Sequence, residues 1–385
     1  MMHIAFLTPE YPHSKALIAA GIGTSIKNLA HSLVKNGCKV TIFVYGQENQ
    51  LVEDQEGITI HLIKNVDYKI GKWFFYSKYL QKYINSVVKK ENISLIEAPD
   101  WTGITAFMKF NVPLILKLHG SDAYFCHLEG RKQKIKNYWF EKMALQNADG
   151  YIAPTNFAAK VTSELFKIDS KKITTIPNGV ELNKFNNQHP KQFEKGVILY
   201  IGTIIRKKGV FELPEIFNEV LKQHPYSKLV LIGNDSHDIL TKSTSTWSKL
   251  KVKFENLGII NSANYLGKVP YHEVQSHIEN AQVCVFPTFA ETQGMVTIEA
   301  MAMNKPVVNS DIGWSNELLI DAESGYLVHP KNHQLFVQKI NLLLADEALC
   351  FQIGANARKR VEEVFDIDKL AVKTIQYYKS RIENN

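Results

Sequence analysis

Short apolar runs alternate with longer stretches of helical period along most of the chain. In the first half, runs rich in β-branched and aromatic residues predict strands at His3–Thr8, Lys39–Val44, Ile58–Ile63, Ser94–Glu97, Leu114–Leu118, Tyr151–Ala153 and Ile173–Ile176. Between these runs, stretches such as Thr24–Asn36 place their apolar residues on one helical face. The alternation of strand and helix predicts an α/β fold with a parallel sheet that helices cover on both faces.

The alternation weakens at residues 182–190, where polar residues and Pro190 predict a linker between domains. It restarts with a strand, a glycine-containing turn and a helix from about Val210, and the strands expected in this half are Val197–Ile201, Leu229–Ile232, Asn264–Leu266, Val283–Phe286 and Val307–Asn309. We therefore expect two doubly wound, Rossmann-like domains, at residues 1–185 and 186–365. Open α/β sheets bind ligands at the carboxyl ends of their strands, so the expected site is a cleft between the domains.

Composition limits the class of protein. A length of 385 residues suits two domains, and four scattered cysteines without a Cys-x-x-Cys pair predict buried free thiols in a reducing compartment. The first ten residues read as a strand and not as a signal peptide. No run approaches the roughly 18 apolar residues of a membrane-spanning helix. We expect a cytoplasmic protein, with peripheral attachment at the inner face of the cytoplasmic membrane as an alternative.

The positive charge lies mainly in the first half, where residues 1–183 hold 22 Lys and Arg against 16 Asp and Glu, in a chain of net charge +7. Such a half could face anionic lipid or an acidic substrate, or be an ordinary solvated surface. The segment Lys69–Lys90 mixes lysines with six aromatic residues. It is either an interfacial membrane helix or an amphipathic helix packed on its own sheet, and the second interpretation is favoured.

The segment Phe289–Ala302 carries the most specific chemistry. It follows the strand Val283–Phe286, so Glu291 is expected in the loop at the carboxyl end of that strand. The backbone N–H groups around Gly294, Met295 and Val296 should open a helix, and a helix start attracts a sugar hydroxyl or a phosphate oxygen. Glu299 lies further into the same helix, where a carboxylate could hold ribose hydroxyls.

The pair Glu291 and Glu299, with Gly294 between them and Ala300-Met301-Ala302 after, resembles the signature of retaining glycosyltransferases of family 4. Further segments resemble that family in the same order, and they are Gly21-Ile22-Gly23-Thr24, His119-Gly120-Ser121-Asp122, Ile176-Pro177-Asn178-Gly179-Val180, Gly202–Gly209 and Asn316-Glu317. The resemblance covers about residues 3–330. It implies the GT-B architecture, in which two Rossmann-like domains face a central cleft and a last helix, here residues 366–385, crosses back to the first domain.

The resemblance also assigns roles. Glu291 would touch the donor sugar, Glu299 the ribose, Lys208 the diphosphate and His119 the donor sugar from the other domain. A fixed ammonium at Lys208 would stabilise the charge that gathers on the leaving diphosphate. In the first domain, Gly21 and Gly23 would let the backbone approach the diphosphate; the third glycine of a dinucleotide fingerprint is absent after them, which weighs against a nicotinamide enzyme.

One residue departs from the family pattern. The loop that usually begins Gly-Arg begins here with Gly202-Thr203, so an expected guanidinium is missing. Arg206 lies close by in the sequence, and it is a candidate replacement in donor binding. A solvated basic turn at Arg206-Lys207-Lys208 is the alternative.

Another strand of the first half ends with Glu97, Asp100 and Trp101. These three residues are candidates for the acceptor site, with an ordinary loop as the alternative. Asp122 is expected to cap a helix. The resembled family needs no metal, and we read Asp366-Ile367-Asp368 as a helix start and not as a Mg²⁺ or Mn²⁺ site.

The sequence thus predicts a metal-independent, retaining glycosyltransferase without a cofactor. It would move a sugar from a nucleotide-diphosphate donor to a glycan or lipid-linked acceptor, in cell-surface polysaccharide synthesis, with no nucleic-acid partner. One rival is a sugar-nucleotide epimerase on the same fold, which breaks the same bond and transfers nothing. The other is a non-catalytic protein that binds sugar nucleotides.

Overall fold

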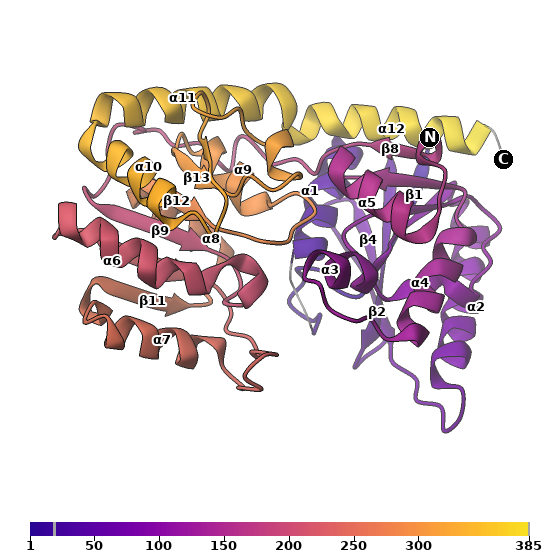
Figure 1. Cartoon of the computed structure of the whole chain (residues 1–385). Coiled ribbons are helices and arrows are strands. Elements are labelled where there is room, and N and C mark those ends of the chain that lie inside the picture. Colours follow the sequence, from indigo (N-terminus) through magenta and orange to yellow (C-terminus); the bar gives the residue numbers. More distant parts are fainter. Residues whose placement is uncertain (18–20, 384–385) are drawn as a thin grey trace. The chain divides into compact units, whose positions relative to one another are not determined.

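The computed structural model describes residues 1–17 and 21–383, and the chain divides into two compact units (Figure 1). The first unit combines Met1–Glu181 with Ile367–Asn385, and the second is the continuous stretch Leu182–Asp366. Each unit contains one sheet flanked by helices. The α/β fold expected from the alternating pattern is confirmed in both units.

The first unit is built on an eight-stranded sheet of order β3-β4-β2-β1-β5-β6-β7-β8. Its strands are β1 (His3–Thr8), β2 (Lys39–Gln47), β3 (Leu51–Gln55), β4 (Ile58–Lys64), β5 (Leu95–Pro99), β6 (Leu114–Lys117), β7 (Gly150–Ala153) and β8 (Ile173–Thr175). All pairs are parallel except β3 with β4. The central strand β1 is buried over its whole length, as a strand covered on both faces must be.

The antiparallel strand β3 was not predicted, and it changes the expected all-parallel sheet. Its residues Leu51, Val52, Glu53, Asp54 and Gln55 are mostly polar, and its side chains are exposed or half-buried. An exposed edge strand needs no apolar run, because one edge faces no partner strand and solvent hydrates its side chains. The sequence pattern therefore carried no signal for it.

The helices of the first unit are α1 (Gly21–Lys35), α2 (Lys72–Glu91), α3 (Asp122–Leu128), α4 (Ile135–Gln146), α5 (Asn156–Phe166) and α12 (Ile367–Glu383), with short 3-10 turns at η1 (Trp101–Phe107) and η2 (Ser170–Lys172). Local chemistry sets several of their ends. Thr155 caps α5 by accepting the Ala158 N–H, and α2 ends where Asn92 takes the left-handed conformation that asparagine tolerates.

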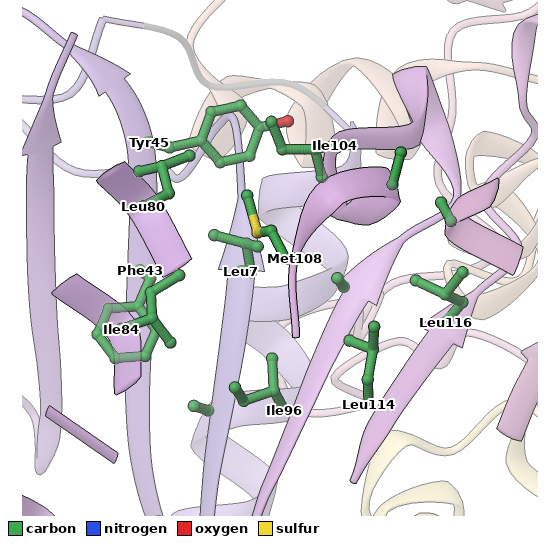
Figure 2. Packing of buried hydrophobic residues seen from close by; sticks show 14 of the residues in the cluster. Leu7, Phe43, Tyr45, Leu80, Ile84, Ile96, Ile104, Met108, Leu114 and Leu116 are labelled. Carbon is green, nitrogen blue, oxygen red and sulfur yellow. The ribbon is translucent and has the colours of Figure 1, made fainter. Parts of the chain in front are cut away.

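Helix α2 contains most of the segment Lys69–Lys90, for which the sequence left two interpretations open. Leu80 and Ile84 of α2 are fully buried, and Figure 2 shows them beside Tyr45 and Phe43 of β2. Burying each such side chain is worth about 1.5–3 kcal/mol. The helix is therefore packed on its own sheet, as favoured, although Phe74 and Phe75 of its first turn remain exposed.

Helix α12 belongs to the first unit, although it is far from the rest of that unit in sequence (Figure 1). Leu370, Ala371 and Tyr378 of α12 are buried in the same core cluster as β1. The Asp368 carboxylate accepts a hydrogen bond of 2.7 Å from the Ser32 hydroxyl of α1 and pairs with Lys35. Asp368 thus fastens α12 to α1.

The second unit is built on a six-stranded parallel sheet of order β11-β10-β9-β12-β13-β14. Its strands are β9 (Val197–Ile201), β10 (Lys228–Ile232), β11 (Ala263–Gly267), β12 (Val283–Phe286), β13 (Val307–Asn309) and β14 (Tyr326–Leu327). Its helices are α6 (Leu213–Gln223), α7 (Thr246–Asn256), α8 (Tyr271–Asn280), α9 (Met295–Ala302), α10 (His333–Ala345) and α11 (Glu347–Val364), with 3-10 turns at η3 (Arg206–Lys208), η4 (Val210–Glu212), η5 (Ile260–Ser262) and η6 (Ser315–Glu317). The two-residue strand β14 was not predicted.

Two expectations from the sequence concern the cysteines and membrane-spanning helices. The four cysteines are free and buried, as predicted. Among the described residues, no helix combines the length and the apolar character that crossing a bilayer requires.

Candidate functional site

The candidate donor residues of the second unit lie at one edge of its sheet. Strands β9 and β12 are parallel neighbours, so the loops that follow them leave from the same edge. A backbone hydrogen bond of 2.8 Å, from the Phe289 N–H to the Lys207 carbonyl, joins the two loops. This contact brings the loop Gly202–Gly209 against the loop that carries Glu291.

Gly209 makes the approach of these loops possible. Its φ is +71°, and a Cβ added there would lie 1.7 Å from the Pro287 carbonyl oxygen. No side chain fits into that space, and a side chain would also be strained in this left-handed conformation. The glycine that ends the loop is therefore a packing requirement.

Replacing Gly209 with alanine is expected to destabilise the second unit more than replacing Gly258. Gly258 has nearly the same φ, +70°, but an added Cβ meets nothing within 4 Å. Gly258→Ala should cost about 1–2 kcal/mol for the left-handed conformation alone. Gly209→Ala should add overpacking of about 1–3 kcal/mol. Urea unfolding of both variants measures the difference, and equal losses would refute the close approach.

Lys208 and Glu291 form an ion pair between the two loops. Both side chains are largely shielded from solvent, at 17% and 19% exposure. Burial, and then the neighbouring Lys207, lower the pKa of Lys208 to about 7. The structure therefore brings together the residues predicted to bind the diphosphate and the donor sugar.

Helix α9 begins directly after this pair. Gly294 precedes the helix with φ +86°, and an added Cβ there would lie 3.1 Å from the buried Trp314 ring. The N–H groups of Met295 and Val296 lie in the first turn, where the helix itself supplies no acceptors. The predicted strand, loop and helix start are confirmed, and the first turn of α9 can receive an anion or a hydroxyl group.

Glu299 lies in α9 and is buried. The Tyr271 hydroxyl donates a hydrogen bond of 2.8 Å to its Oε1 atom. Burial raises the pKa of Glu299 to about 7, and this hydrogen bond opposes the shift. Tyr271 was not predicted, because it starts α8 and reaches Glu299 only through the tertiary fold.

Arg206 has a partner within the second unit. Its guanidinium forms a two-pronged pair with Asp238, in which Nη2 donates to Oδ2 at 2.7 Å, and it stacks over the Phe211 ring at 4.1 Å. The pair holds the pKa of Asp238 well below its usual range. Asp238 was not predicted, since it lies 32 residues away in the sequence. Arg206 could contact a donor only with its remaining N–H groups, so its replacement of the missing arginine stays a prediction.

In the first unit, His119 follows β6 and is half-buried. The Asp100 Oδ1 atom accepts the His119 backbone N–H at 2.9 Å. Burial, and then the nearby Lys117, lower the pKa of His119 to about 3. The imidazole is therefore neutral near pH 7, and it can both donate to and accept from a sugar hydroxyl.

Two of the three candidate acceptor residues need correction. Glu97 is buried, and its Oε2 atom accepts a hydrogen bond of 2.5 Å from the Tyr378 hydroxyl of α12. Asp100 is also buried and holds the backbone of His119. Neither carboxylate faces outward to meet an acceptor, because the strand end that carries them is covered by the fold. Trp101 is 41% exposed and remains a candidate.

The expected glycine-rich loop of the first unit is the first turn of α1. Gly23 donates its N–H to the Glu10 Oε1 atom at 2.9 Å, and an added Cβ would lie 2.8 Å from the Glu10 carbonyl oxygen. The space beside Gly23, which a side chain would fill, is thus taken by Glu10 of the same chain. Around Gly21, an added Cβ meets no described atom within 4 Å, so its predicted contact with a diphosphate stays a prediction.

Two smaller expectations concern helix starts. Ser121, and not Asp122, caps α3, since its side chain accepts the Tyr124 N–H at 3.2 Å. Asp122 is instead the first helical residue. The predicted helix start at Asp366–Asp368 is observed as the start of α12. Within the residues that the structure describes, no three His, Cys, Asp or Glu side chains gather as a metal site would require.

Both halves of the chain match known families. Residues 19–184 match the family described as Glycosyltransferase Family 4, and residues 182–360 match the family described as Glycosyl transferases group 1. The two matches meet at the boundary between the units.

Individual proteins are similar over most of the chain. An uncharacterised glycosyltransferase of Methanocaldococcus jannaschii is 24% identical over 99% of both chains. The capsular polysaccharide biosynthesis glycosyltransferase CapM of Staphylococcus aureus is 29% identical over 59% of this chain and 60% of its own. The crystal structure of Anabaena HepE in complex with UDP and glucose aligns with a TM-score of 0.79 at 17% identity, covering 99% of this chain and 100% of HepE.

Proposed function

The chain belongs to the family 4 glycosyltransferases, which have the GT-B fold, and from this premise we propose that it transfers a sugar from a nucleotide-diphosphate donor with retention of configuration. The acceptor would be a glycan or a lipid-linked saccharide of a cell-surface polysaccharide. The capsular role in the name of CapM supports this setting, and the UDP and glucose bound to HepE support the donor class.

The observation that carries the proposal is the Lys208–Glu291 pair beside the first turn of α9. A leaving nucleotide diphosphate gains negative charge as its bond to the sugar breaks. The Lys208 ammonium and the α9 N–H groups would stabilise that charge. Glu291 would then hold the sugar, and Glu299 would hold the ribose one turn further along the helix.

The reaction would need no nucleophile from the protein. The bond from the anomeric carbon to the leaving phosphate oxygen breaks, and the acceptor hydroxyl forms its bond on the same face of the sugar. The leaving phosphate oxygen takes the acceptor proton. A neutral His119 would contact a hydroxyl of the donor sugar.

Turnover is expected to survive saturating chelator. In this proposal Lys208 and the α9 N–H groups would supply the positive charge that a metal supplies elsewhere, and Asp368 is already paired with Lys35. The measurement is product formation with and without EDTA. Loss of activity that Mg²⁺ or Mn²⁺ restores would contradict this scheme. The metal would then have to be bound by carboxylates that come together only when the donor is bound.

Thermal-shift screening with uridine, guanosine and adenosine diphosphate sugars tests the proposal, because a bound donor stabilises the native state by mass action. Turnover with the stabilising donor then separates the alternatives. Release of an epimerised sugar without acceptor would indicate an epimerase. Binding without any turnover would indicate a non-catalytic protein, an idea that only Thr203 favours.

We also propose that the enzyme works at the cytoplasmic side of the membrane and contacts it peripherally through the basic first unit. The excess of lysine and arginine in residues 1–183 supports this placement.

A further inference from the structure

Two buried carboxyl groups hold the backbone around His119. Asp100 precedes η1 and Glu141 lies in α4, and each of these residues is 1% exposed. The Asp100 Oδ1 atom accepts the His119 N–H at 2.9 Å. The Glu141 Oε1 atom accepts the Asp122 N–H at 2.8 Å, and its Oε2 atom accepts the Ala123 N–H at 3.1 Å. The two carboxyl groups therefore hold both ends of one short turn.

Gly120 makes this turn and cannot fix the direction of the chain by itself. Its φ is +102°, in a region that glycine enters freely and other residues avoid. Because glycine has no side chain that restricts its dihedral angles, the orientation of His119 depends on the groups that hold the residues on both sides. Asp100 holds the chain before Gly120, and Glu141 holds it after Gly120.

The first N–H groups of α3 all bond within the chain. Glu141 accepts the first two, and Ser121 accepts the next two through its hydroxyl and its carbonyl oxygen. A helix start attracts an anion when its N–H groups lack acceptors. We therefore expect the start of α3 to fix the turn after His119, and not to receive the diphosphate.

Glu141 is itself held in place. The Gln133 amide donates a hydrogen bond of 2.8 Å to its Oε2 atom. The backbone of Glu141 packs closely on η1, since a Cβ added to Gly103 would lie 2.6 Å from the Glu141 nitrogen. The Asn137 amide of α4 also donates to the Asp122 Oδ2 atom at 3.1 Å. A side chain that is locked by such partners can hold a reacting group within narrow limits.

The two carboxyl groups are an unfavourable arrangement for folding alone. Burial, and then Glu141, raise the pKa of Asp100 to about 8. The Asp100 Oδ2 atom is buried without a hydrogen-bond partner among the described residues. Neighbouring buried carboxyl groups and unpaired buried polar atoms destabilise a folded chain, and such features gather at functional sites.

We propose that Glu141 is a positioning residue of the reaction, whose carboxylate fixes the turn after His119 and thereby the place at which the imidazole meets the donor sugar. The proposal rests on the proposed function, because it requires His119 to touch the donor. A shift of about 1 Å in a reacting group can lower a rate by roughly 100-fold. Glu141 acts through the backbone of the turn and touches no substrate itself.

Steady-state kinetics of three variants tests the positioning. Glu141→Gln keeps the shape of the side chain but replaces one acceptor atom with a donor, so it should lower kcat by roughly 10- to 100-fold and leave the donor KM near the wild-type value. Gln133→Ala removes only the amide that orients the carboxylate, so it should lower kcat by a smaller factor. Asp149→Asn is the matched control, because Asp149 accepts the Leu114 N–H at 2.8 Å at the start of β6. It should turn over like wild type.

A double-mutant cycle separates positioning from a general effect on the fold. In the His119→Ala background, Glu141→Gln should cause little further loss of kcat, because the group that it positions is gone. An equal fold-loss with and without His119, or a wild-type kcat in Glu141→Gln, would overturn the proposal.

Melting temperatures show whether each variant is folded. If Glu141→Gln does not fold, Gln133→Ala decides the question in the same cycle, and a wild-type kcat in Gln133→Ala would then overturn the positioning. Turnover of the wild-type chain tests the proposed function separately. A wild-type chain that binds a donor and turns nothing over would contradict that function, whereas an active chain with independent losses in the cycle would contradict the positioning alone.

Discussion

Replacing Lys208 with alanine is expected to lower turnover by roughly 10- to 150-fold while the protein stays folded. The change removes the ammonium that faces Glu291, and a charge-assisted hydrogen bond is worth about 1.5–3 kcal/mol. Steady-state kinetics on the donor identified by thermal shift measures the loss. Lys207→Ala is the matched control, because it removes a lysine from the same turn and keeps the backbone carbonyl that joins the loops. Wild-type turnover in Lys208→Ala would remove this residue from the site.

The low pKa of Lys208 adds a dependence on pH. At a pKa of about 7, the free enzyme loses the proton as the pH rises, whereas a bound diphosphate would raise the pKa and retain it. Donor binding should therefore take up a proton and weaken above about pH 7, by up to tenfold per pH unit. The sugar nucleotide has no terminal phosphate that titrates in this range. In Lys208→Arg the charge is permanent, so the pH dependence should flatten, and an unchanged profile would contradict this assignment.

Glu291→Gln and Glu299→Gln are expected to change different kinetic parameters. Glu291 would hold the reacting sugar, where contacts can strengthen as the bond breaks, so its loss should lower kcat by roughly 10- to 150-fold. Glu299 would hold the ribose, which does not react, so its loss should raise the donor KM by a similar factor and leave kcat nearly unchanged. Each substitution keeps the shape of the side chain and removes its charge.

The variant Tyr271→Phe tests the role of Glu299 in a second way, alongside Glu299→Gln. It removes the hydroxyl that donates to Glu299, so it should shift the same parameter, donor KM, by a smaller factor of roughly 2- to 12-fold. If Glu299→Gln lowered only kcat and Glu291→Gln only donor affinity, the donor would lie in the opposite direction along α9.

Local signals predicted the parts of the fold and site that are contiguous in sequence. Three such parts follow one another along the chain: the strand Val283–Phe286, the loop at Glu291 and the helix that starts after Gly294. The apolar run indicates the strand, the glycine indicates the loop, and the helical period indicates the helix. The helix also ends as its sequence suggests, because Asn304 takes the left-handed conformation beyond it with φ +58°.

Contacts between distant segments could not be predicted in this way. Tyr271 beside Glu299, Asp238 beside Arg206 and Glu10 beside Gly23 depend on the tertiary fold, and none of these partners lies in a motif. The burial of Glu97 has the same origin. A carboxylate at a strand end reads as exposed until Tyr378, from a helix 281 residues away, covers it.

The discontinuous first unit has a consequence for folding during synthesis. The second unit is continuous in sequence, so its core can close as soon as Leu182–Asp366 has left the ribosome. The first unit emerges earlier, but Tyr377, Tyr378 and Leu370 of its core are synthesised after the whole second unit. Until α12 arrives, the Glu97 carboxylate and the apolar side chains around Ile4 and Ile115 lack their cover. We therefore expect the half of the chain that is made first to finish folding last, and to be the one that would need protection by chaperones in the interval.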